Sequence, residues 1–99
     1  MNVSEWDDLK KNKHFEDLVD FPCSFPIKVV CRTGGWVRQA VEERLAGVPP
    51  DPVAQFVDHR MSRQGKYVSF TIRLEVESAG HLRQCYGALD GLACVRLVL

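Results

Sequence analysis

The stretch SRQGKYVSFTIRL, residues 62–74, holds the clearest strand pattern in the sequence. From Tyr67 onward, apolar and polar residues alternate for eleven positions, which is typical of a strand with one buried and one open face. Gly65 stands just before the alternation and favours a turn there. The residues expected to face inward are Val68, Phe70, Ile72, Leu74 and Val76.

Three further segments of the chain have strand character. Residues 25–32 alternate with period two, so they predict a second well-patterned strand. Residues 53–61 look extended but poorly patterned, which suits the edge of a sheet. Residues 93–99 alternate again and predict a last strand that belongs to the core sheet. The inward residues expected in this last strand are Ala93, Val95, Leu97 and Leu99.

Two segments between these strands have apolar residues at helical spacing. The first helix is predicted over residues 37–45 and ends at Gly47, before the breaker sequence VPPDP. The second is predicted over residues 82–89, where apolar residues recur at i, i+3, i+4 and i+7. Ser78 is a suitable N-cap for it.

The predicted order is strand, helix, strand, strand, helix, strand. This order predicts an α+β fold, the ferredoxin-like βαββαβ sandwich, with both helices on one face of a four-stranded antiparallel sheet in the order 4-1-3-2. The two best-patterned strands then lie in the centre. Residues 1–20 are polar and predict a partly helical N-terminal arm, whereas residues 21–99 predict a single domain.

Composition limits the classes of function. The 99 residues include 13 basic and 13 acidic ones, so no net charge attracts the chain to nucleic acid. No stretch approaches the roughly 20 apolar residues that span a bilayer, and the N-terminus lacks the pattern of a signal peptide. We therefore expect a cytoplasmic protein without a membrane partner.

The sequence indicates no catalytic group, metal site or cofactor. The four cysteines form no C-x-x-C pair, and the three histidines, His14, His59 and His81, have no second ligand at helical spacing. Each histidine is expected at the surface, and no nucleophile has an evident activating base. We expect a protein that is not an enzyme.

Three segments carry a resemblance to a known family. FPCSFPIKVV at residues 21–30, SRQGKYVSFTI at residues 62–72 and VRLVL at residues 95–99 resemble the YbeD family of small bacterial proteins of unknown function. The family's fold looks like that of ACT domains, which sense ligands for biosynthetic enzymes, and its members are sometimes named lipoate regulatory proteins. The resemblance implies a regulatory domain, but it does not extend to the N-terminal arm.

The open face of the predicted sheet collects candidate binding residues. Its cations, with the neighbouring hydroxyl of Ser69, could hold an anionic metabolite or an acidic partner, because guanidinium groups bind carboxylates bidentately. The alternative is pairing with Glu75 and Glu77 on a solvated surface. The cations in question are Lys28, Arg32, Arg73 and Arg96.

Two other features of the sequence suggest ligands. By resemblance to ACT domains, the loop at Gly34 and Gly35 could bind a small molecule, although the same glycines also suit a tight turn. Tyr67 lies in KYVSF, which resembles part of an RNA-binding signature and would place an aromatic platform on the open face. An RNA-binding module is therefore the alternative to a regulatory or protein-interaction domain.

A homodimer is a further expectation, because two edge strands would leave backbone groups unpaired.

Overall fold

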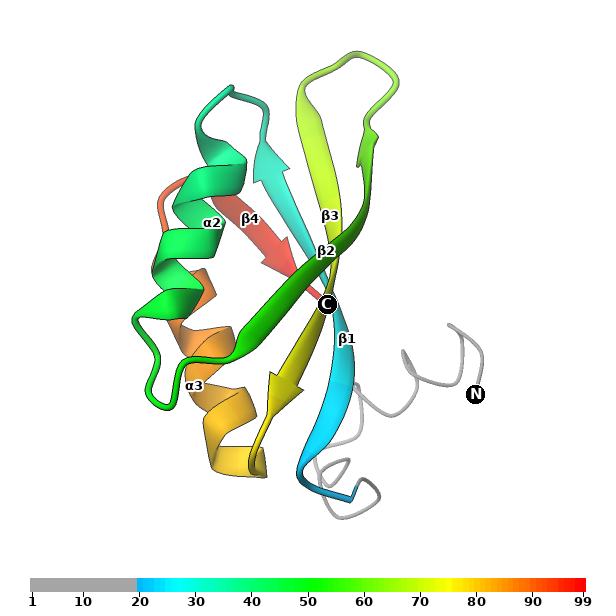
Figure 1. The fold of residues 1–99 in the computed structure, drawn as a ribbon. Helices are drawn as coiled ribbons and strands as arrows, with labels where there is room; N and C mark the ends of the chain where they lie inside the picture. Colours follow the sequence, from blue (N-terminus) through cyan, green and yellow to red (C-terminus); the bar gives the residue numbers. More distant parts are fainter. Residues whose placement is uncertain (1–19) are drawn as a thin grey trace.

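The computed structural model describes residues 20–99, and the predicted arm, apart from Asp20, lies outside the described residues. The described chain has the predicted order of strands and helices (Figure 1). The sheet order is β2-β3-β1-β4, which is the predicted order read from the other edge, and all three pairings are antiparallel. The elements are β1 (Cys23–Arg32), α2 (Val37–Ala46), β2 (Val53–Met61), β3 (Tyr67–Val76), α3 (Ala79–Asp90) and β4 (Val95–Val98).

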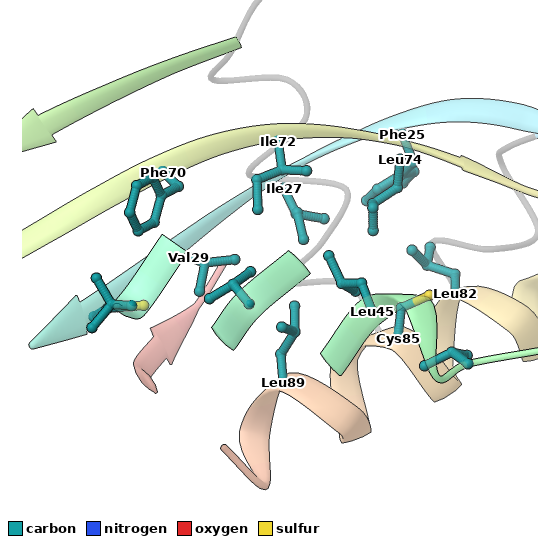
Figure 2. Packing of buried hydrophobic residues seen from close by; sticks show 14 of the residues in the cluster. Phe25, Ile27, Val29, Leu45, Phe70, Ile72, Leu74, Leu82, Cys85 and Leu89 are labelled. Carbon is teal, nitrogen blue, oxygen red and sulfur yellow. The ribbon is translucent and has the colours of Figure 1, made fainter. Parts of the chain in front are cut away.

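The hydrophobic core lies between the sheet and the two helices, which cover the same face of the sheet (Figure 1). Alternate residues of the central strands β1 and β3 point into this layer and meet apolar side chains of α2 and α3 (Figure 2). The period-two pattern of both strands therefore corresponds to one buried face. Core residues labelled in Figure 2 include Phe25, Ile27, Ile72, Leu74, Leu45, Leu82 and Leu89.

The orientation predicted for the last strand is wrong at both ends, since Ala93, expected to face inward, is exposed and precedes β4. Along β4 the register shifts opposite Val30 and Cys31, so one extra residue is accommodated there. Leu97 then pairs with Val30 on the open face and is 49% exposed, whereas Val98 pairs with core-facing Val29 and packs against the core. Leu99 is also exposed rather than buried. An unbroken alternation cannot anticipate this shift.

Local signals set the limits of the other elements. The Ser78 side chain accepts a hydrogen bond from the His81 amide at 3.0 Å, so it caps α3 as predicted. Gly65 has φ 71 in the turn between β2 and β3, a conformation that favours glycine. As expected for an edge strand, β2 is mostly exposed, and its register with β3 shifts after Phe56.

No helix among residues 20–99 is long and apolar enough to cross a membrane.

Candidate functional site

The open face of the sheet carries most of the predicted binding residues. On β1 the buried residue Val29 stands between Lys28 and Val30, and strand alternation therefore places Lys28 on the opposite face. The same argument places Arg32 there, and on β3 it places Tyr67, Ser69 and Arg73. Lys28, Arg32 and Arg73 are exposed, whereas Tyr67 and Ser69 are half-buried.

The four predicted cations do not converge on one point. Arg73 pairs across the strands with Pro26, whereas Arg32, six positions further along β1, pairs with Tyr67. At ~3.3 Å per residue the two guanidinium-bearing positions are about 20 Å apart along the sheet. Arg96 lies at the register shift of the edge strand β4. A single small anion therefore cannot contact all four cations.

These cations also have no ionic partners within the described part of the chain. Lys28, Arg32, Arg73 and Arg96 form no ion pair with any residue from 20 to 99, and the alternative of pairing with Glu75 or Glu77 is not observed there. Their charges therefore face solvent. Such a surface can attract an acidic partner without first breaking an internal ion pair.

Apolar residues lie among these cations. Across the strands, Val30 has Ser69 on one side and exposed Leu97 on the other, and Tyr67 lies two residues from Ser69 along β3, opposite Arg32. A shallow depression of about 150 Å³ is lined by Val30, Arg60, Met61, Ser62, Tyr67 and Ser69. We define the open-face patch as Val30, Tyr67 and Leu97 with the cations Lys28 and Arg32. Sequence alternation missed Leu97 because of the β4 register shift.

A polar hollow adjoins the open-face patch toward β2. It has a volume of about 450 Å³ and is lined by Lys28, Asp58, His59, Arg60, Ser69 and Thr71. Thr71 pairs with Lys28 on one side and with Asp58 on the other. The hollow therefore contains charges of both signs, unlike a purely cationic anion site.

The predicted glycine loop connects β1 to α2. The indole of Trp36 lies against Gly34, because a Cβ atom on Gly34 would be 3.0 Å from the indole Nε1. A side chain on Gly35 would meet no atom within 4 Å. Trp36 is 61% exposed and gives α2 no side-chain cap. The loop is thus tight at Gly34 and open at Gly35, and it follows Arg32 directly.

Tyr67 is the single aromatic residue on the open face among residues 20–99; the phenylalanines of the strands all point to the other face. In RNA-binding modules of this fold, aromatic side chains on the open sheet face stack two or three bases. The described face therefore offers one aromatic ring on which a base could stack, beside Arg32. The RNA-binding alternative remains a prediction.

The buried thiols are weak nucleophiles. Burial raises the pKa of Cys31 to about 12, with neighbouring Cys94 as a further cause, and burial raises the pKa of Cys85 to about 11. The neutral thiol is the favoured form at ordinary pH. Residues 20–99 contain no group of three or more His, Cys, Asp or Glu side chains that could hold a metal ion.

His81 departs from the sequence-based expectation. We expected a surface histidine, as at exposed His59, but His81 is only 4% exposed. Its Nδ1 atom accepts a hydrogen bond from the Glu77 amide at 3.1 Å, and its Nε2 atom is buried with no hydrogen-bond partner among residues 20–99. The available signal was its position four residues before buried Cys85, on the core face of α3. His14 lies outside the described residues.

Comparison with known proteins agrees with this fold and identifies the family. The described chain is an α+β domain of ferredoxin-like topology, and it is similar to the solution structure of protein HP0495 from H. pylori. That match has a TM-score of 0.65 and 20% identity, and it covers 82% of this chain and 85% of the other. At this identity the similarity concerns the fold alone.

Comparison of the amino-acid sequence identifies the family. Residues 16–99 match the family model described as protein of unknown function, DUF493, and the chain belongs to that family. A UPF0250 protein of Neisseria meningitidis is 32% identical over 92% of this chain and all of its own length. A UPF0250 protein of Shewanella is 37% identical over 89% of this chain and 98% of its own. The resemblance to the YbeD family is thereby confirmed.

Proposed function

We propose that this chain is a non-enzymatic binding domain of the cytoplasm that recognises an acidic segment of a protein partner on its open-face patch. One observation carries the proposal: exposed Leu97 and half-buried Val30 and Tyr67 lie beside cations that have no ionic partner in residues 20–99. An apolar centre with a charged rim is the usual composition of a protein-binding surface.

The two parts of the open-face patch have different roles in this proposal. Burial of Val30, Tyr67 and Leu97 supplies affinity, because apolar area leaves water. Lys28 and Arg32 select acidic partners and accelerate their encounter. A small anionic metabolite is less well supported, since the cations are spread along the strand. A regulatory role of the ACT type would then act through the partner that the domain binds.

Site-specific crosslinking tests this proposal. A photoreactive phenylalanine analogue is placed at Tyr67 in one variant and, as the matched control, at exposed Glu43 on α2 in another. Both variants are irradiated in bacterial cells, and the products are identified by mass spectrometry. We expect a protein adduct at position 67 that is absent at position 43 and is lost when Lys28 and Arg32 are both replaced by alanine.

Other adduct patterns decide against the proposal. The same proteins crosslinked at both positions, or an adduct that persists in the Lys28→Ala, Arg32→Ala background, would contradict selective binding at the patch. A nuclease-sensitive adduct at position 67 would replace the proposal by the RNA-binding alternative. The absence of any adduct at position 67 would remove the patch as the binding surface.

A second candidate, self-association, is supported by the edge strand β2. This strand carries Val53, Val57 and Met61, three of the six large hydrophobic residues that are exposed among residues 20–99. Unpaired backbone groups on such an edge can pair with a second copy of the chain. We expect sedimentation equilibrium to detect a dimer that Val57→Lys weakens, and a monomer at all concentrations would exclude it.

A further inference from the structure

We propose that the shallow depression on the open face receives one apolar side chain of the acidic partner segment, and that Arg60 binds an acidic residue next to it. This inference rests on the proposed function, because it concerns the same partner on the same face of the sheet. It adds the pattern that the partner presents, an apolar residue flanked by acidic ones. It also adds Arg60, which lies outside the open-face patch, as a specificity-determining residue.

The depression lies on a row of paired residues that crosses all four strands. Ser69 on β3 pairs with Arg60 on one side and with Val30 on the other. Val30 pairs in turn with Leu97 on β4. At ~4.8 Å between neighbouring strands, Arg60 and Leu97 are about 14 Å apart. The row therefore has a cation at one end and apolar side chains at the other, within the length of a short peptide.

The hydroxyl groups in the wall of the depression are already hydrogen-bonded. The Ser62 hydroxyl accepts a hydrogen bond from the Tyr67 amide at 3.0 Å, and the Ser69 hydroxyl donates to the Arg60 carbonyl oxygen at 3.5 Å. An apolar side chain that enters the depression leaves water without displacing either hydrogen bond. Apolar and aromatic side chains complete the wall, those of Val30, Met61 and Tyr67.

The volume of the depression limits its occupant to one side chain. It is about 150 Å³. A closed apolar cavity of about 150 Å³ holds a molecule of the size of benzene, so one leucine or phenylalanine side chain fills a depression of this volume. The rest of the bound segment then stays above the sheet, where its neighbouring residues meet the cations.

Two cations flank the depression. Arg60 lines it from β2, and Arg32 on β1 pairs with Tyr67. Neither arginine forms an ion pair with any residue from 20 to 99. Asp58 lines the adjoining hollow but not the depression, and its carboxylate accepts a hydrogen bond from the His59 amide at 2.8 Å. An acidic residue beside the apolar side chain is therefore attracted to Arg60 and Arg32, whereas a basic residue is repelled.

Nuclear magnetic resonance titration of the labelled full chain tests the inference with four blocked pentapeptides. Their sequences are DDLDD, DDADD, NNLNN and KKLKK. We expect saturable shifts of the Val30, Tyr67 and Ser69 amides and of the Met61 methyl group with DDLDD. The dissociation constant of DDADD should be about fivefold higher, because alanine loses most of the apolar area that a half-buried leucine removes from water. NNLNN should also bind more weakly, and KKLKK should give no saturable shifts.

Two exposed arginines of the open face give matched variants that should still fold. Arg73 is four positions from Ser69, about 13 Å along β3 at ~3.3 Å per residue, so a pentapeptide with its leucine in the depression does not reach it. We expect Arg60→Gln to raise the dissociation constant of DDLDD about threefold, as exposed charge pairs do, and Arg73→Gln to leave it unchanged. Met61 is 50% exposed at the end of β2, and Met61→Ser should reduce the preference for DDLDD over DDADD.

The outcomes separate this inference from the proposed function. Equal affinities for DDLDD and DDADD, or equal effects of Arg60→Gln and Arg73→Gln, would overturn the inference and leave an acidic partner standing. Equal affinities for DDLDD and NNLNN, or tighter binding of KKLKK, would overturn the selection of acidic partners as well. The absence of saturable shifts with every peptide also overturns the inference, whereas the crosslinking at Tyr67 decides the proposed function independently.

Discussion

Replacing Leu97 and Leu74 by alanine, one at a time, tests the register shift of β4. Leu74 on β3 is completely buried, so Leu74→Ala removes transfer free energy and leaves a cavity, with an expected cost of about 3 kcal/mol. Leu97 is 49% exposed, so Leu97→Ala removes only about half of the burial energy of a leucine, roughly 1 kcal/mol or less, and it leaves no closed cavity. An inward Leu97 would instead cost about as much as Leu74.

Urea unfolding measures the difference between the two variants. For a chain of this size we take a slope of about 1.5 kcal/mol per molar urea, so Leu74→Ala should lower the midpoint by about 2 M and Leu97→Ala by about 0.6 M. Equal slopes in both variants and the parent protein are the control for two-state behaviour. Equal midpoint losses would refute the register shift and place Leu97 in the core.

Three further predictions concern caps, buried hydroxyls and thiols. Ser78→Ala removes the cap of α3 and should lower the free energy of unfolding by about 1 kcal/mol in urea, whereas no change would contradict the cap. Tyr86→Phe removes a buried hydroxyl that has no hydrogen-bond partner in the described part of the chain, so we expect an unchanged or higher urea midpoint; a clear loss would show that the hydroxyl is hydrogen-bonded. Burial raises the pKa of Cys31 to about 12 and of Cys85 to about 11 from 9.0, so the folded state holds these protons more tightly than the unfolded chain. The contribution of these thiols to the free energy of unfolding is then fully present below about pH 9 and is lost as the pH rises toward 12. A urea midpoint that does not fall between about pH 8.5 and 10.5 would exclude this contribution.

Local sequence was sufficient for most of the fold. The alternation of residues 67–76 and the helical spacing that includes Leu82 and Leu89 each correspond to an observed element, and the cap at Ser78 is confirmed. These signals work because each element must bury one face, and the spacing of apolar residues records that face. The order of the elements then restricts the sheet topology to few choices.

The candidate site was predictable only in part. Alternation placed Lys28, Arg32 and Tyr67 on the open face, because a strand's two faces follow from period two alone. The spacing between cations depends on which residues pair across strands, so the separation of Arg73 from Arg32 could not be read from either strand alone. The loop at Gly34 was noted, but the position of the Trp36 indole over it is a matter of tertiary packing.

The sequence by itself determined which residues form strands and helices, and which face of each central strand is apolar, because those properties are periodic along the chain. Tertiary structure alone decided the outward position of Leu97, since a register shift is set by pairing with β1 rather than by the pattern of β4. It also decided which residues of β1, β2 and β3 meet beside His81 at the end of the sheet. Contacts between such segments have no local period to record them.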